Sequence, residues 1–309
     1  MQPAAISTRV AAWTGSSASR AALAGVSANV FLGASSLYWK ALGAIPATTL
    51  LGYRIVASLL MLALVLAARR SFKGLAGKLT RRLVLLHAGA AALVVVNWGT
   101  FIWASIHGHV VESGLGYLVA PFVAIGVGAL WFKEGMTAAR LAAIAVIVLA
   151  LTLLLVGSGE LEHRVYLIIG GTWGGYACLK KMTSLDAFSG LFLETCALAA
   201  LLPLLVLLGP FTLTLPAGLA TDPLLLLALC GAVSVVPLAL FSFAAARLPL
   251  SVMGFFQFVL PSTQLIVALA VYHQSVSGNT LAAFGAIWLS LAVIVIEPMW
   301  KAWRQSHAI

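Results

Sequence analysis

The chain is a succession of long apolar runs, and these runs are what most limit the folds that it can adopt. Charged residues, glycine or proline separate ten of them, near residues 21–42, 46–68, 83–105, 108–132, 138–157, 163–182, 188–209, 223–245, 249–272 and 279–300. About 20 apolar residues in a helix cross the hydrocarbon core of a bilayer, which is roughly 30 Å thick. Because lipid offers no partners to backbone N–H and C=O groups, runs without polar–apolar alternation span it as helices. The sequence predicts an all-α polytopic membrane protein with ten transmembrane helices.

The composition excludes the usual classes of soluble protein. Of the 309 residues, 62% are hydrophobic and 8% are charged, whereas a soluble domain has about 25% charged residues. A cytosolic enzyme, a secreted domain or a disordered chain needs more polar surface than this. The three cysteines, Cys178, Cys196 and Cys230, form no Cys-x-x-Cys pair. We therefore expect no disulfide framework, no metal and no other cofactor.

The basic residues predict how the chain is oriented in the membrane. A formal net charge of +10 would suggest a nucleic-acid partner on a soluble fold, but here the basic residues occupy short connections. With the N-terminus in the cytoplasm, Lys40 and Arg164 face outward and Arg54 lies within a run. The other 15 fall on the cytoplasmic side: Arg9, Arg20, Arg69, Arg70, Lys73, Lys78, Arg81, Arg82, Lys133, Arg140, Lys180, Lys181, Arg247, Lys301 and Arg304. The positive-inside rule thus predicts that both termini are cytoplasmic, with no nucleic-acid partner.

The sequence also contains an internal similarity at a spacing of 140 residues. This shift aligns Lys40 with Lys180, Phe101 with Phe241, Ala104 with Ala244, Gly114 with Gly254, and Pro121 with Pro261. We expect a cytoplasmic arm over 1–20, five-helix repeats over 21–157 and 158–300, and a cytoplasmic tail over 301–309. Five is odd, so the second repeat enters the membrane from the opposite side, as the inverted repeats of many secondary transporters do. The alternative is a duplicated bundle that only packs symmetrically.

Arg54 and Glu194 lie well inside predicted spans, where each charge costs roughly 2.5–3.5 kcal/mol on insertion scales. Arg54 and Glu194 are 140 residues apart and so occupy equivalent positions in the two repeats. We expect both to line a central cavity, where the Arg54 guanidinium offers a fork of donors to a ligand that carries a carboxylate. The alternative is an ion pair that fixes the packing of the helices.

A second carboxylate, Glu112, begins the fourth span beside His109. A carboxylate in the first turn is favoured by the helix dipole, which is the simpler interpretation. The functional interpretation is a protonatable, proton-coupling site near the outer mouth with His109 as proton partner. The sequence His107-x-His109 lacks further ligands at suitable spacing, so it does not indicate a metal site.

The fourth and ninth spans carry glycine and proline at matching positions. Gly114 and Pro121, with Gly254 and Pro261, are expected to let these helices bend near mid-membrane, although close packing is the alternative for the glycines. Tyr117 and Gln257 from the same spans are expected to face the cavity. The glycines of the sixth span, Gly170, Gly171, Gly174 and Gly175, predict a helix-contact surface rather than a phosphate loop.

Several motifs resemble one family in combination. They are Asn97-Trp98-x2-Phe101-Ile102-Trp103-Ala104, His109-x2-Glu112-x2-Leu115-Gly116-Tyr117-x3-Pro121, Val236-Pro237-Leu238 and Gly254-Phe255-Phe256-Gln257-x3-Pro261. From about residue 20 to residue 297 the chain resembles the RarD (chloramphenicol-sensitivity) family of the EamA drug/metabolite transporter superfamily. One difference is His273-Gln274, where the relatives usually have Gly-Glu after the ninth span.

This resemblance implies an architecture and an activity. It implies ten helices in two inverted repeats, with the first four helices of each repeat around a cavity, in the bacterial inner membrane. It implies secondary transport of a small metabolite or drug-like molecule, most often as efflux. The expected substrate-binding residues are Arg54, Glu194, Tyr117, Gln257, Asn97, Trp98, Phe101 and Phe255. The expected partners are this substrate, a coupling ion such as the proton, and membrane lipid. The sequence does not predict an oligomeric state.

Other function classes fit the sequence less well. The segment from Gly74 to Lys78 lacks the spacing and the Ser/Thr of a nucleotide-binding phosphate loop, which argues against a primary pump. No protease motif and no pair of aspartates lies within the spans, so we expect a protein that is not an enzyme. A membrane scaffold or sensor that moves no solute is the alternative, and an intramembrane enzyme is a weaker one.

Overall fold

The computed structural model describes residues 16–131, 137–157, 161–208, 211–245, 247 and 256–306. Within these ranges the regular secondary structure is entirely helical. The helices are α2 (Ser16–Ala41), α3 (Ala47–Ala68), α4 (Phe72–Ala76), α5 (Arg81–His107), α6 (Val110–Trp131), α7 (Ala138–Gly157), α8 (His163–Lys181), α9 (Ala187–Leu208), α10 (Thr221–Ala228), α11 (Cys230–Ala245), α13 (Val259–Ala270) and α14 (Gly278–Ser306). The prediction of an all-α polytopic membrane protein is confirmed.

Five helical stretches are long and apolar enough to cross a bilayer. They are Ser19–Ala41, Ala47–Ala68, Arg81–His107, Ala187–Leu207 and Thr221–Ala244, the last of which combines α10 and α11. Shorter apolar helices cover Val110–Val123, Leu141–Val156, Val259–Ala270 and Gly278–Val293. The predicted sixth span, α8, belongs to neither group because its glycines and its terminal lysines dilute its apolar residues.

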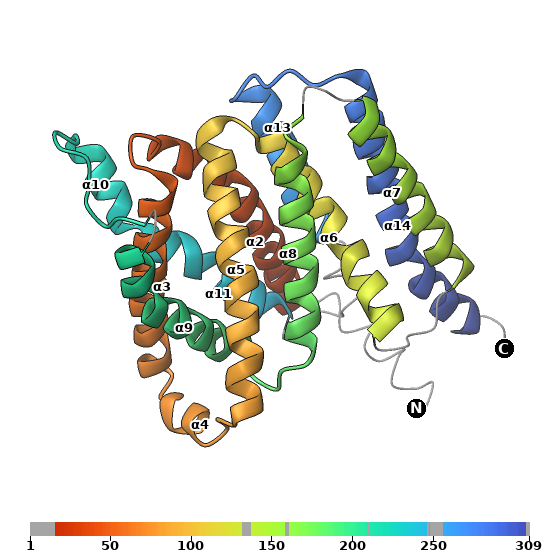
Figure 1. Ribbon diagram of the computed structural model, residues 1–309. Coiled ribbons are helices and arrows are strands. Elements are labelled where there is room, and N and C mark those ends of the chain that lie inside the picture. Colours follow the sequence, from red (N-terminus) through yellow and green to blue (C-terminus); the bar gives the residue numbers. More distant parts are fainter. Residues whose placement is uncertain are drawn as a thin grey trace.

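The helices form a bundle in which chain neighbours mostly run in opposite directions (Figure 1). The short helix α4 lies at the lower end of the view, and α2 begins and α14 ends towards that end. We call it the α4 end of the bundle. It also carries the start of α5 and the end of α8, so many of the basic residues of the connections gather there.

The two largest apolar clusters among the described residues hold most of the bundle together. Leu115, Leu118, Ile147, Phe284 and Ile287 belong to a core that α6, α7, α13 and α14 share. A second core joins α2, α3, α5, α9 and α11, and its fully buried members include Leu42, Leu50, Ile55, Leu62 and Ile102. Dispersion and close packing stabilise such contacts even in lipid, where burial from water contributes little between helices.

Glycines bring α6 and α8 into close contact. A Cβ on Gly116 would lie 2.7 Å from the Cβ of Ile169, and one on Gly174 would lie 2.7 Å from the carbonyl oxygen of Ala120. Gly170 lies against the backbone of Gly116. The helix-contact surface predicted for the sixth span therefore forms through Gly170 and Gly174.

Helices α3 and α9 occupy corresponding positions in the two halves of the chain and run in opposite directions. Helices α3 and α9 both have 22 residues and begin 140 residues apart. The hydroxyl of Tyr53, near the start of α3, donates to the carbonyl of Leu213, which follows the end of α9. Arg69, just after α3, lies 4.0 Å from Asp186, just before α9. The two helices therefore run antiparallel.

Candidate functional site

A small cavity in the interior of the bundle surrounds Arg54. Its volume is about 50 Å³, and helices from both halves of the chain line it with Leu32, Ser35, Trp39, Arg54, Asn97, Trp98, Phe101, Tyr117, Trp173, Val233 and Leu260. Of the four Trp and Tyr rings in this wall, Trp39 and Trp98 are buried, and Tyr117 and Trp173 are partly buried. A cavity of this size has room for a few water molecules. A metabolite needs the helices to move apart.

The Arg54 side chain is held by aromatic rings rather than by a carboxylate. Its exposed fraction is 8%, and its guanidinium carbon lies 4.0 Å from the ring centre of Trp98 and 5.2 Å from that of Trp39. Its Nε and Nη1 atoms have no hydrogen-bond partner. No ion pair of Arg54 occurs within the described residues. Cation–π contacts offset only part of the cost of burying this charge, so its donors remain available to an anionic group.

Asn97 and Tyr117 form the polar part of the cavity wall. The Tyr117 hydroxyl donates to Oδ1 of Asn97 at 3.0 Å, and Nδ2 of Asn97 donates to the Thr172 hydroxyl at 3.1 Å. The Tyr117 ring meets Phe101 and Trp173 edge to face. The structure therefore brings together five of the predicted residues: Arg54, Asn97, Trp98, Phe101 and Tyr117. The cavity wall also contains Trp39 and Trp173. These two were not predicted as site residues, although both are aromatic residues within predicted spans.

Glu194 is fully buried and lies elsewhere, in a cluster of polar side chains at the α4 end. Its carboxylate contacts Nδ1 of His87 at 2.8 Å and accepts hydrogen bonds from Nζ of Lys180 and the hydroxyl of Tyr176, both at 2.9 Å. We call these four residues the Glu194 cluster. The structure does not bring Glu194 to Arg54. Lys180, predicted to lie in a cytoplasmic connection, is in the last turn of α8, so its ammonium reaches back into the bundle.

Glu112 occupies a similar position at the opposite end of the bundle. Its buried carboxylate contacts Nδ1 of His109 at 3.0 Å and accepts hydrogen bonds from Nε2 of Gln274 at 2.7 Å and the backbone N–H of Glu162 at 3.2 Å. We call His109, Glu112 and Gln274 the Glu112 cluster. Glu112 and His109 are in contact, as the sequence predicted. Gln274 was not predicted as a site residue.

The hydrogen bonds of Gln274 require a side chain that both accepts and donates, as an amide does. Its Oε1 accepts from the backbone N–H groups of Val110 and Val111 at the start of α6, while its Nε2 donates to Glu112. An ionised glutamate here would accept the same two bonds but could not donate to Glu112. Gln274, one of the two residues that distinguish this chain, therefore joins the start of α6 to the segment after α13.

The predicted hinge residues lie at a close helix contact. A Cβ on Gly114 would lie 3.2 Å from the Cβ of Gln264 and 3.4 Å from the carbonyl oxygen of Pro261. Helix α6 continues through Pro121 without a break. The structure thus agrees with the packing interpretation of Gly114. The predicted residues Gly254 and Phe255 lie outside the described residues.

The sequence predicted that Gln257 of the ninth span faces the cavity, but another glutamine of this span is the buried one. Gln257 is exposed and is not among the residues that line the cavity. Gln264 is fully buried instead, and its Nε2 donates to the Ser113 hydroxyl at 3.2 Å. Its Oε1 has no hydrogen-bond partner.

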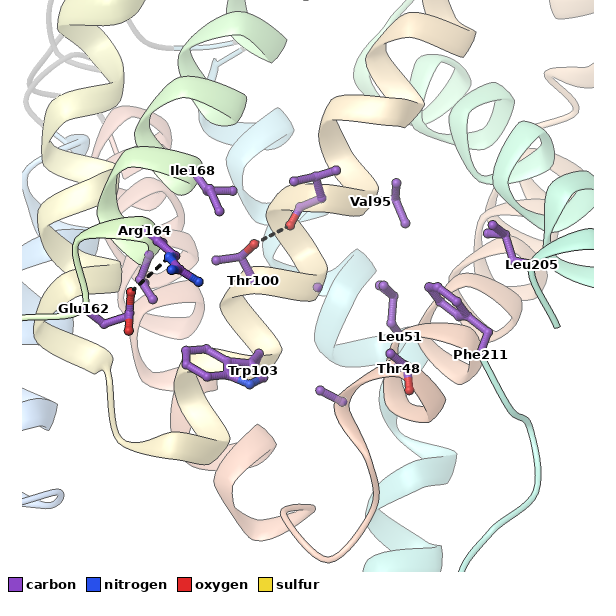
Figure 2. Close-up of a pocket in the computed structure, with 14 residues that line it drawn as sticks. Thr48, Leu51, Val95, Thr100, Trp103, Glu162, Arg164, Ile168, Leu205 and Phe211 are labelled. Carbon is purple, nitrogen blue, oxygen red and sulfur yellow. Dashed lines mark hydrogen bonds and ion pairs between the residues drawn. The ribbon is translucent and has the colours of Figure 1, made fainter. Parts of the chain in front are cut away.

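A larger groove opens on the surface of the bundle between α3, α5, α8 and α9. Its volume is about 650 Å³. Figure 2 shows Arg164, Glu162 and Ile168 on one side of it and Leu205 and Phe211 on the other. Its walls are largely apolar, and the Thr100 hydroxyl within it donates to the carbonyl of Val96. In a membrane such a surface suits lipid chains, so the cavity around Arg54 is the stronger candidate for a polar ligand.

Comparison with known proteins agrees with this architecture. No protein-family model matches the chain. An uncharacterised transporter of Vibrio cholerae is 32% identical over 282 residues, which cover 91% of this chain and 93% of that protein. The protein RarD of Streptomyces exfoliatus is 32% identical over 277 residues, which cover 88% of this chain and 86% of that protein.

A solved crystal structure shares the fold. It covers 88% of this chain and 96% of its own, with a TM-score of 0.58 at 18% identity. That identity supports the helical arrangement alone, whereas the relatives above are similar in sequence over almost their whole length. The chain belongs to the RarD family of membrane proteins, several of whose members are named transporters.

Proposed function

We propose that this protein is a secondary active transporter for a small metabolite or drug-like molecule that carries an anionic group. It moves this substrate across the bacterial inner membrane by alternating access, in the direction of export. The observation that carries the proposal is the buried Arg54, which has aromatic neighbours and no ion pair within the described residues. The names of the relatives as transporters support the class of activity.

The closure of both ends of the bundle supports alternating access. The Glu112 cluster joins α6 to the connection after α13, and the Glu194 cluster joins α5, α8 and α9. Because the cavity between them holds only about 50 Å³, a substrate reaches Arg54 only when one end opens. The antiparallel directions of α3 and α9 support an inverted repeat, in which one half of the bundle moves against the other.

Location, orientation and energy source complete the proposal. The excess of Lys and Arg in the connections on one side supports an orientation with both termini in the cytoplasm. A proton gradient is the proposed energy source, with Glu112 and His109 as one protonatable pair near the outer mouth. Lipid surrounds the bundle, and no cofactor is needed for this activity.

Uptake by proteoliposomes tests the role of Arg54. Radiolabelled carboxylate-bearing metabolites are screened with the full chain, with and without an imposed pH gradient, and one that accumulates is then used with the Arg54→Gln variant. A hydrogen bond to a charged group contributes about 1.5–3 kcal/mol, so we expect about a 10- to 100-fold loss of kcat/KM.

Arg164→Gln is the matched control, because it removes an exposed arginine outside the cavity. It should transport at the wild-type rate. If folded, well-inserted Arg54→Gln also transports at that rate, Arg54 does not bind substrate. If none of the labelled compounds accumulates under any gradient, a scaffold or sensor without solute flux becomes the better assignment.

A further inference from the structure

The Glu194 cluster has a composition that the proposed substrate site does not require. It combines one carboxylate, one lysine, one histidine and one tyrosine from three helices, with exposed side-chain fractions of 0% for Glu194 and 1% for His87. We propose that this cluster is a proton-binding site, and that proton binding at His87 opens the α4 end of the bundle. The inference rests on the proposed function, since it names the coupling site of the same transporter.

The hydrogen bonds define where the proton binds. An ionised carboxylate only accepts, so Nδ1 of His87 carries a hydrogen and donates to Glu194. In the neutral ring Nε2 is then an acceptor, and the Thr183 hydroxyl, 2.9 Å away, donates to it. A hydronium ion can transfer its proton to the lone pair of Nε2, which forms one N–H bond and releases water. The Thr183 hydroxyl then rotates and accepts, so both forms of the ring keep two partners.

The proton changes the balance of charge in the cluster. With a neutral His87, the carboxylate of Glu194 and the ammonium of Lys180 compensate each other at 2.9 Å. With a protonated His87, two cations share one carboxylate, and an unbalanced charge away from water is unfavourable. Lys180 is the cation that can leave, because 21% of its side chain is already exposed. We therefore expect protonation of His87 to move Lys180 into the solvent.

Other ionisable groups near the cluster do not remove this imbalance. Tyr176 from α8 donates to the second carboxylate oxygen of Glu194 and is neutral. From the connection to α9, Thr183 contributes a hydroxyl, and the Asp186 carboxylate lies 4.0 Å from Arg69 with about half of each side chain exposed. Because both side chains are hydrated, water and salt screen their charges, and the pair does not compensate the extra charge of the buried cluster.

Loss of the Lys180 contact would separate helices that the cluster holds together. His87 belongs to α5, Lys180 to α8 and Glu194 to α9, so a single carboxylate links all three. The backbone of α9 approaches closely at Gly190, where a Cβ would overlap the Lys180 ammonium and lie 2.9 Å from Cε1 of His87. When the ammonium leaves, Tyr176 is the remaining contact of α8 with Glu194, and this weaker link lets the way to Arg54 open from the α4 end.

The Glu112 cluster provides an internal comparison with the opposite charge balance. It contains one carboxylate, one histidine and an amide, so a proton on His109 would neutralise it rather than add an excess charge. Protonation there strengthens an ion pair and keeps that end closed. A histidine beside a buried carboxylate is therefore not sufficient for opening. Lys180 is the residue that distinguishes the Glu194 cluster from the Glu112 cluster.

The test measures the α4 end directly and needs no substrate. Cysteines replace Lys78 and Met182, which are exposed at that end, after the three native cysteines are changed to alanine. Spin labels on this pair in nanodiscs report distances by double electron–electron resonance between about pH 8.5 and about pH 5.5, which covers most of the range in which histidine side chains change charge. We expect a longer distance to gain population, by up to about tenfold per pH unit across the transition.

Three variants decide the assignment. His87→Gln keeps a donor for Glu194 but binds no proton, and it should stay in the short-distance population at every pH. Lys180→Gln should abolish the transition as well. His107→Gln, which changes an exposed histidine outside both clusters, is the matched control and should keep the transition. A wild-type distance that does not change with pH, or a transition that survives in folded His87→Gln, would overturn the proposal.

Failure of this inference is distinguishable from failure of the proposed function. The Arg54→Gln variant should lose substrate transport and still open with pH, because Arg54 is not part of the Glu194 cluster. Should His87→Gln fail to fold, ¹⁵N-histidine spectra of the wild type provide the second measurement. One of the six histidines must gain a proton with the same midpoint as the distance change, and its absence would also overturn the proposal.

Discussion

Single residues in this protein have roles that depend on whether their polar groups find partners. Glu194 accepts three hydrogen bonds and is fully buried, whereas the equally intramembrane Arg54 has two nitrogen atoms without partners. A buried polar group without a partner is costly, so its persistence indicates a ligand or a functional state. A residue whose hydrogen bonds are all satisfied contributes to stability and to closure of the bundle.

Asp186 illustrates a satisfied carboxylate outside the spans. It precedes α9, and its carboxylate accepts from the backbone N–H groups of Phe188 and Ser189 and from the Ser189 hydroxyl. Burial raises the pKa of Asp186, but these hydrogen bonds and nearby Arg69 outweigh it and lower the pKa below its usual value. The stabilisation is therefore present above the unfolded-state pKa of about 3.9 and is lost as the pH falls through the lower folded-state value.

We expect Asp186→Ala to lower the free energy of unfolding at neutral pH by about 0.5–2 kcal/mol, the usual effect of removing an N-cap. The difference from the wild type should shrink below about pH 4. Thermal unfolding in detergent, followed by circular dichroism, measures both effects. Asp222→Ala removes an acidic residue from the first turn of α10 and should change stability less. Equal losses for the two variants would contradict the capping role.

At the scale of helices, close packing depends on glycine where the spans meet. The contact between α6 and α8 brings Gly174 against the backbone carbonyl of Ala120 and the side chain of Val123. On the neighbouring face of α8, nothing lies within 4 Å of a Cβ built on Gly171. Two glycines of one helix therefore differ in what a methyl group would meet.

Gly174→Ala and Gly171→Ala form a matched pair. The first forces the α6 backbone away, and we expect it to lower the free energy of unfolding by about 1–3 kcal/mol. The second should be neutral or stabilising by up to about 1 kcal/mol, because alanine has the higher helix propensity. Thermal unfolding of both purified proteins in the same detergent compares them. A loss of the same size in both would show that propensity or expression, rather than the helix contact, determines stability.

At the scale of the whole molecule, two clusters around carboxylates close opposite ends of the bundle. Figure 1 shows α4 at one end, where the Glu194 cluster lies, and the connection between α5 and α6 at the other, near the Glu112 cluster. The Arg54 cavity lies inside the bundle, lined by helices of both halves. This arrangement is what an alternating-access carrier needs, since each end has its own set of contacts to break.

Labelling with a membrane-impermeant maleimide tests the predicted orientation. In a cysteine-less background, Lys78→Cys and Ser306→Cys should react only after the cells are permeabilised. Ala44→Cys and Ala217→Cys, in the connections at the opposite end, should react in spheroplasts. The positive-inside rule is the reason for this expectation. Labelling of Lys78→Cys from outside would show that the protein has the reverse orientation.

The sequence by itself determined the class of the protein, the positions of most helices and the presence of a charged side chain, Arg54, inside a span. Apolar runs of about 20 residues leave few alternatives to helices in lipid, and a charge inside such a run needs a reason wherever the helix packs. The tertiary structure alone decided which side chains meet. It joined Glu194 to His87 and Lys180 rather than to Arg54, and it assigned Gln274 to Glu112. In a membrane both the lipid-facing and the core-facing sides of a helix are apolar, so hydrophobic periodicity does not reveal which face points inward.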